Sequence, residues 1–148
     1  MTKFVPSMGR ILAIDYGTKR TGVAVSDPMR IIATALETVP THAIYSWLAK
    51  YMASENVDII VVGKPLKTDG SPSDTYPHAL GMARRLEKEY PGVKVLMFDE
   101  RFTSVMALRS LIESGVRKMD RRDKAAVDKV SATILLQGFM ESKMYREL

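Results

Sequence analysis

Residues 57–62, with the sequence VDIIVV, form a continuous apolar run directly after a segment with helical periodicity. A short apolar run of this kind predicts a strand whose two side-chain faces are both covered. The preceding segment, residues 41–54, places apolar side chains at the spacing i, i+3, i+4, i+7, which is typical of an amphipathic helix. These side chains are Ile44, Trp47, Leu48 and Tyr51. A buried strand beside an amphipathic helix indicates the α/β fold class.

The other strands and helices follow from the same kinds of pattern. Short β-branched runs predict strands at 10–15, 21–27, 31–39, 57–62 and 93–98. Apolar spacing and capping residues predict helices at 41–54, 77–90, 104–115 and 125–143, with Thr41 as the cap of the first. Three consecutive strands followed by alternating helices and strands predict a mixed five-stranded sheet with right-handed crossovers and helices on both faces.

Length and composition are those of one ordinary domain. The chain has 148 residues, 46% of them hydrophobic, and a chain of this size buries enough surface to fold without a disulfide or structural metal. The absence of cysteine excludes disulfide frameworks and thiol nucleophiles and favours a cytoplasmic location. No apolar run reaches the roughly 18 residues of a membrane span, so we expect no membrane insertion. We expect a flexible extension at 1–9, one domain at 10–143 and a C-terminal tail at 144–148.

Three carboxylates stand at positions that the fold pattern does not explain. Asp15 ends the apolar run ILAI, where an ionised side chain is costly to bury unless it is paired or binds a cation. Glu100 lies two residues beyond a predicted strand, where the loops of α/β proteins collect binding groups. Asp128 shares a helical stripe that we expect to face the sheet. The rest of that stripe is Ala132, Leu135 and Phe139.

Each carboxylate also has a purely structural interpretation. Asp15 before Gly17 is typical of a turn aspartate that accepts backbone hydrogen bonds. Glu100 can form a surface ion pair with the adjacent Arg101. Asp128 lies near the start of its predicted helix, where the helix dipole favours a negative charge. If the three converge at one rim of the sheet, however, their repulsion opposes ionisation and a divalent cation removes that cost.

The chemistry of these ligands favours a hard cation. Carboxylate oxygens without histidine or cysteine suit Mg²⁺ or Mn²⁺, which keep waters and substrate phosphates among their ligands. The two histidines, His42 and His78, fall at predicted helix starts and are expected to be solvated. From the residues alone, Asp15, Glu100 and Asp128 are therefore candidate ligands for such a cation, beside the structural interpretations given above.

Positive charge favours an anionic partner. The formal net charge is +5, which is consistent with nucleic-acid binding. Basic residues expected at the same rim, where they can contact phosphates, are Lys19, Arg20, Lys64, Lys67 and Arg101. The loop 115–124 carries most of the excess charge, which is also typical of a solvated surface loop. Its candidate nucleic-acid contacts include Arg121, Arg122 and Lys124. No aromatic pair is spaced as a base-stacking platform, which favours recognition of nucleic-acid shape.

Four segments resemble the YqgF (RuvX) family and occur in the family's order over about residues 10–140. They are DYGTKRTGVAVSD (15–27), VVGKPLKTDGS (61–71), FDERFTS (98–104) and VDKVSATILLQ (127–137). Lys64 departs from the pattern, because many relatives have a more apolar residue there. The resemblance implies an RNase H-like fold, in which the five strands take the order 3-2-1-4-5.

The resemblance also implies an activity. Such a protein is expected to be a nuclease that hydrolyses phosphodiester bonds of structured nucleic acid, in maturation of the 16S rRNA 5′ end or as a Holliday-junction resolvase. Asp15, Glu100 and Asp128 match the family's catalytic acidic residues, which would hold two Mg²⁺ or Mn²⁺ ions. The expected partners are structured RNA or branched DNA and ribosomal precursor particles, and the chain would act as a monomer or homodimer.

Two other classes of function fit parts of the sequence. Kinases and ATPases of the actin and sugar-kinase type also begin with an Asp-x-Gly-Thr hairpin, but they close two such domains around a nucleotide and this chain has the length of one. A non-catalytic binding module for nucleic acid or ribosome assembly would keep the same basic rim. Cleavage assays with and without divalent metal distinguish that module from a nuclease.

Overall fold

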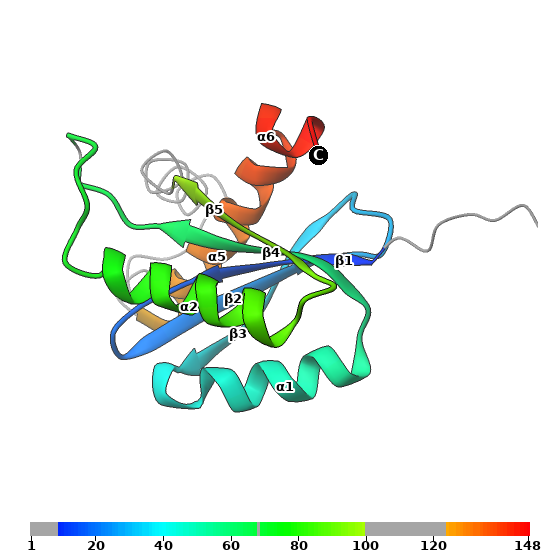
Figure 1. Ribbon diagram of the computed structural model, residues 1–148, viewed down its shortest axis with the longest axis horizontal. Coiled ribbons are helices and arrows are strands. Elements are labelled where there is room, and N and C mark those ends of the chain that lie inside the picture. Colours follow the sequence, from blue (N-terminus) through cyan, green and yellow to red (C-terminus); the bar gives the residue numbers. More distant parts are fainter. Residues whose placement is uncertain (1–8, 68, 100–123) are drawn as a thin grey trace, which may run out of the picture.

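The computed structural model describes residues 9–67, 69–99 and 124–148 of the chain (Figure 1). The described strands are β1 (Arg10–Asp15), β2 (Arg20–Ser26), β3 (Ala33–Pro40), β4 (Val57–Lys64) and β5 (Lys94–Asp99). The described helices are the 3-10 helix η1 (Thr41–Ala43), α1 (Ile44–Ser54), α2 (Tyr76–Glu89), α5 (Lys124–Met140) and α6 (Lys143–Arg146). The helix predicted at 104–115 lies outside the described residues.

The five strands form one sheet with the order β3-β2-β1-β4-β5. β2 pairs antiparallel with β1 and β3, whereas β4 pairs parallel with β1 and β5. Because of these directions, β1, β4 and β5 all end at one edge of the sheet, at Asp15, Lys64 and Asp99. We call it the carboxyl edge, and β2 begins there at Arg20. The predicted mixed sheet and its strand order are confirmed.

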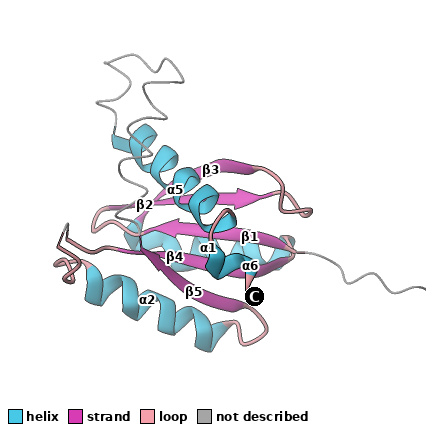
Figure 2. Ribbon diagram, turned by 90° about the horizontal axis from the view of Figure 1, so that it is seen from above, coloured by secondary structure: helices cyan, strands magenta, loops and turns pink. Residues whose placement is uncertain are grey.

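Burial on both faces of the sheet explains the apolar runs in β1 and β4. Along β1, Leu12 and Ile14 enter the core cluster formed with α1 and α2, whereas Ile11 and Ala13 enter the cluster formed with α5. All four residues are fully buried, and burial of each of the large aliphatic side chains contributes about 1.5–3 kcal/mol. Figure 2 shows α5 in front of the sheet and α1 behind it. The predicted placement of helices on both faces is confirmed.

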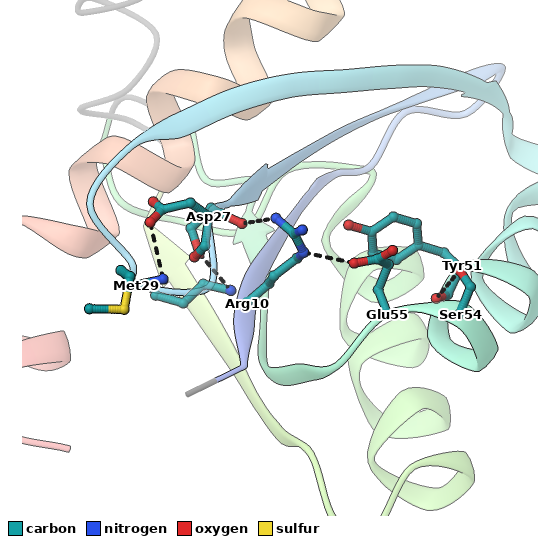
Figure 3. A network of polar contacts seen from close by, with 8 residues as sticks. Arg10, Asp27, Met29, Tyr51, Ser54 and Glu55 are labelled. Atoms are coloured by element: carbon teal, nitrogen blue, oxygen red, sulfur yellow. Dashed lines mark hydrogen bonds and ion pairs between the residues drawn. The ribbon is translucent and has the colours of Figure 1, made fainter. Parts of the chain in front are cut away.

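Polar contacts hold the opposite edge of the sheet, where β1 begins. The Nε atom of Arg10 donates to Oε1 of Glu55 at 3.0 Å (Figure 3). Asp27, which follows β2, accepts hydrogen bonds from three backbone N–H groups of the next loop. These bonds, that of Ile32 above all, lower the pKa of the Asp27 carboxyl group. The other donors are Met29 and Ile31.

Gly9, the last residue of the extension predicted at 1–9, is fixed to the folded domain by hydrogen bonds. Gly9 is buried and donates its N–H to Oδ2 of Asp58 at 2.7 Å. Arg30 binds both partners, because its Nε donates to the Gly9 carbonyl oxygen at 2.9 Å and its Nη2 pairs with Asp58 at 2.8 Å. Residues 1–8 lie outside the described part of the chain.

Two details of the helices differ from the predictions. Thr41 does not cap the helix after β3, since neither η1 nor α1 has a side-chain cap. Its hydroxyl instead donates to the carbonyl oxygen of Gly17 at 2.6 Å. In α2, Ala79 is buried and the predicted Leu80 is only partly buried. The buried stripe of α2 consists of Ala79, Met82, Ala83 and Leu86.

The last long helix is shorter than predicted, because α5 ends at Met140 and not at residue 143. Ser142 interrupts the helix: its hydroxyl donates to the carbonyl oxygen of Phe139 at 2.6 Å and accepts from the N–H of Tyr145 at 3.2 Å. Tyr145 then packs on Phe139 with 5.4 Å between ring centroids, so part of the predicted tail contacts the core. In the described part of the chain, no helix is long and apolar enough to span a membrane.

Candidate functional site

Asp15 is the last residue of β1 and lies at the carboxyl edge. The four residues before it are fully buried, while Asp15 itself is only partly buried. The local sequence explains this position, because ILAI draws the strand into the core and the following polar segment leaves the sheet. Partial shielding from water strengthens the interaction of a carboxylate with a cation.

The turn after Asp15 is held rigidly by Thr41. A Cβ atom at Gly17 would collide with the carbonyl oxygen of Arg20, so this tight turn requires glycine. The N–H of Thr41 donates to the Lys19 carbonyl oxygen at 2.9 Å, and its hydroxyl donates to that of Gly17. The single hydroxyl proton of Thr41 is thereby used, so the buried Thr21 hydroxyl donates to Thr41 across 2.9 Å.

Asp128 lies on α5, one helical turn before Ala132. Ala132, Leu135 and Phe139 are all buried, so the predicted stripe faces the sheet at these three positions. Figure 2 shows that α5 begins on the side of the sheet where β1 and β4 end. The start of α5 therefore lies on the same side of the molecule as Asp15.

The remaining predicted carboxylate, Glu100, follows the last residue of β5 and lies outside the described residues. The side chain of Asp128 lies outside them as well. Among the side chains that the structure does describe, no three His, Cys, Asp or Glu residues converge as a metal site. Convergence of Asp15, Glu100 and Asp128 stays a prediction.

Several predicted basic residues gather at the carboxyl edge. Lys19 is exposed in the turn between β1 and β2, and Arg20 begins β2. Lys64 ends β4, and Lys67 is exposed in the loop that follows. Lys124 is the first residue of α5, and its side chain lies outside the described residues. Outside the described residues lie Arg101, Arg121 and Arg122. The edge thus combines a carboxylate with cations on two sides.

The structure adds two aromatic residues that the sequence analysis did not select for this site. Tyr16 directly follows Asp15, and its ring stacks on that of His78, with centroids 6.1 Å apart and 11° between the planes. His78 is exposed near the start of α2, in agreement with its predicted solvation. The two residues lie far apart in the sequence, so no spacing rule pairs them.

Comparison with known proteins identifies the family. A family model described as "RuvX: Holliday junction resolvase" matches residues 9–142. This chain belongs to the RuvX family. A Phocaeicola vulgatus protein named "Putative pre-16S rRNA nuclease" is 47% identical over 138 residues, which cover 93% of this chain and 99% of the relative. Relatives of the same name from Bacteroides thetaiotaomicron and Flavobacterium johnsoniae are 46% and 44% identical, and each match covers 93% of this chain and 100% of the relative.

This RuvX-family chain is also similar to a solved structure. The structure titled "T. thermophilus RuvC in complex with Holliday junction substrate" matches with a TM-score of 0.55 and 17% identity, covering 88% of this chain and 94% of that chain. The likeness confirms the RNase H-like fold that the sequence motifs imply. The RuvX match spans all four motifs and all three predicted carboxylates, so the family expected from the sequence is confirmed.

Proposed function

We propose that this RuvX-family protein is a nuclease that hydrolyses phosphodiester bonds of structured nucleic acid, and that its reaction is maturation of the 16S rRNA 5′ end. One observation carries the proposal: Asp15 is a partly buried carboxylate at an edge that also holds Lys19, Arg20 and Lys64. Metal-assisted hydrolysis of a phosphodiester uses a cation-binding carboxylate beside groups that bind phosphate. The names of relatives that are 44–47% identical support the rRNA substrate.

Divalent cations fit the donors at this edge. Asp15 offers carboxylate oxygens at the end of a buried strand, where a bound cation offsets the cost of a charge. We assign Glu100 and Asp128 as the other ligands, and oxygen ligands of this kind suit Mg²⁺ or Mn²⁺. Two such ions, when bound, would activate a water molecule and stabilise charge on the leaving 3′ oxygen.

The protein's own residues would orient the substrate. Lys19 and Arg20 lie on the β1–β2 side of Asp15, whereas Lys64 and Lys67 lie on the β4 side. Contacts with phosphates on both sides would hold the scissile phosphodiester beside the carboxylate. The rigid turn held by Thr41 keeps the first pair of cations at a constant place relative to Asp15.

Branched DNA is the second candidate substrate, because the matching family model is described as a Holliday junction resolvase. A resolvase that cuts two symmetric strands requires a symmetric dimer. A homodimer in solution therefore favours branched DNA, and a monomer favours RNA within ribosomal precursor particles in the cytoplasm. A binding module without catalysis is the third outcome that the assay separates.

Cleavage of precursor 16S rRNA and of a four-way DNA junction, each with Mg²⁺, Mn²⁺ or EDTA, tests this proposal. We expect Asp15→Asn to retain the fold and to abolish metal-dependent cleavage. The matched control is Asp74→Asn, which removes an exposed carboxylate from the loop after β4 and should cleave like the parent. Undiminished cleavage by Asp15→Asn refutes the assignment of Asp15, and cleavage that persists in EDTA refutes metal dependence.

A further inference from the structure

A row of four side chains leads away from the carboxyl edge between α1 and α2. It consists of Tyr16 in the turn after β1, Tyr45 on α1, and His78 and Arg85 on α2, and we call it the aromatic strip. His78 and Arg85 are two helical turns apart and therefore lie on the same side of α2. The strip begins at Tyr16, the residue next to Asp15.

Ring contacts connect the members of the strip in pairs. The rings of Tyr16 and His78 are nearly parallel, with centroids 6.1 Å apart. The guanidinium carbon of Arg85 lies 3.6 Å from the centroid of the Tyr45 ring. Tyr16 and Tyr45 both pack against the core cluster formed by α1, α2 and the sheet. Burial raises the pKa of the Tyr45 hydroxyl, and the nearby Tyr16 adds to the rise while Arg85 opposes it.

Exposure divides the strip into an anchored part and an accessible part. Tyr16 and Tyr45 are half-buried, so the core fixes their rings, whereas His78 and Arg85 are exposed to solvent. Arg85 is paired with Glu89 at 2.8 Å, with side-chain exposures of 51% and 41%. An exposed ion pair of this kind contributes little stability, so the guanidinium can exchange the carboxylate for a phosphate at small cost.

This combination of groups matches the chemistry of an unpaired nucleic-acid strand. Aromatic rings accept the face of any base, and a guanidinium binds phosphate or stacks on a base. In a double helix the base faces are stacked on one another, so they are not available to the rings. A strand that stacks here would continue directly to Asp15, because Tyr16 is its neighbour in the chain.

We propose that the aromatic strip binds an unpaired segment of the nucleic-acid substrate and leads it to the carboxyl edge. The inference rests on the proposed nuclease function and specifies its substrate: structured nucleic acid with a single-stranded stretch next to the cleaved bond. His78 and Tyr16 contact bases, and Arg85 contacts the backbone farther along α2.

Binding of two fluorescent RNA probes to the full-length protein tests the proposal. One probe is a 12-nucleotide oligouridylate and the other is a fully paired, blunt-ended RNA duplex, and anisotropy is recorded in EDTA so that metal-dependent cleavage does not occur. We expect His78→Ala to weaken binding of the single strand about tenfold, which is about 1.4 kcal/mol, and to change duplex binding less than about twofold. His78→Phe keeps a ring and should bind the strand within about threefold of the parent.

A second pair of variants controls for charge. Arg85→Ala and Arg84→Ala each remove one exposed cation from α2, but only Arg85 contacts an aromatic ring of the strip. We expect Arg85→Ala to weaken single-strand binding about five- to tenfold and Arg84→Ala less than about threefold.

The outcomes separate this inference from the proposed function. Any of three results would refute single-strand binding by the strip: equal losses for Arg84→Ala and Arg85→Ala, equal losses for both probes, or parent-like strand binding by His78→Ala. The proposed nuclease function would still stand if Asp15-dependent cleavage remained. Failure of the parent to bind the single strand refutes single-strand binding by the strip as well. If His78→Ala loses strand binding but the parent shows no metal-dependent cleavage, single-strand binding by the strip is supported and the proposed nuclease function is refuted.

Discussion

The substitution Thr41→Val tests how the turn beside Asp15 is held. Valine keeps the branched shape of the side chain but removes the hydroxyl that donates to Gly17 at 2.6 Å and accepts from Thr21 at 2.9 Å. Thr21 is fully buried, so no water replaces the lost partner of its hydroxyl. A lost hydrogen bond costs about 0.5–1.5 kcal/mol, and a buried group left without a partner costs about 1–3 kcal/mol. We expect the free energy of unfolding to fall by about 2–3 kcal/mol.

Urea unfolding followed by circular dichroism measures this loss, with Thr41→Ser as the matched control. In thermal unfolding the same loss corresponds to a decrease in Tm of about 4–12 °C for a chain of this length. Serine retains the hydroxyl and should remain within about 1 kcal/mol of the parent. A loss below about 0.5 kcal/mol in Thr41→Val, or equal losses in both variants, would refute the hydrogen-bond explanation.

Three further predictions concern other parts of the fold. Phe139→Ala removes a fully buried ring that contacts Phe98 and Tyr145, and should lower the free energy of unfolding by about 3–5 kcal/mol in guanidinium titrations; a loss under about 1 kcal/mol contradicts this packing. Gly17→Ala should displace the β1–β2 turn, because the added Cβ meets the Arg20 carbonyl oxygen, and reduce cleavage in the rRNA assay; parent-like activity would show that the turn can relax. Asp27 has a lowered pKa in the folded state, so its contribution to stability is present above about pH 3.8 and is lost as the pH falls through the lower folded value. Unfolding titrations should therefore show that the difference in free energy of unfolding between the parent and Asp27→Ala decreases in strong acid. A difference that stays constant with pH would contradict this prediction.

The positions of most strands and helices could be predicted, because a buried face leaves a local pattern of apolar residues in the sequence. The runs in β1 and β4 are apolar at every position that the two core clusters cover. The turn at Gly17 and the place of Pro77 in the first turn of α2 follow from backbone preferences. The prediction for Thr41 was wrong because its side chain had two possible partners. Thr41 could cap a helix or bind Gly17, and only the folded position of the turn decides between them.

The residues of the candidate site also differ in how far the sequence predicts them. Asp15 could be selected from the sequence, since a charge at the end of a fully apolar strand is locally conspicuous. Loop position and a helical stripe made Glu100 and Asp128 candidates, and the family motifs then assigned both as metal ligands. The pairing of Tyr16 with His78 left no signal in the sequence, because it depends on the distance between the end of β1 and the start of α2.

The sequence by itself therefore determined the strands and most of the helices, the strand order through its family motifs, and the carboxylate at the end of β1. Those properties follow from periodicity, apolar runs and motifs, which are local along the chain. Only the tertiary structure decided that rings from three segments, together with the Arg85 guanidinium, form one strip. Contacts of this kind depend on how the helices pack against the sheet, and packing is a property of surfaces that meet only when the whole chain is folded.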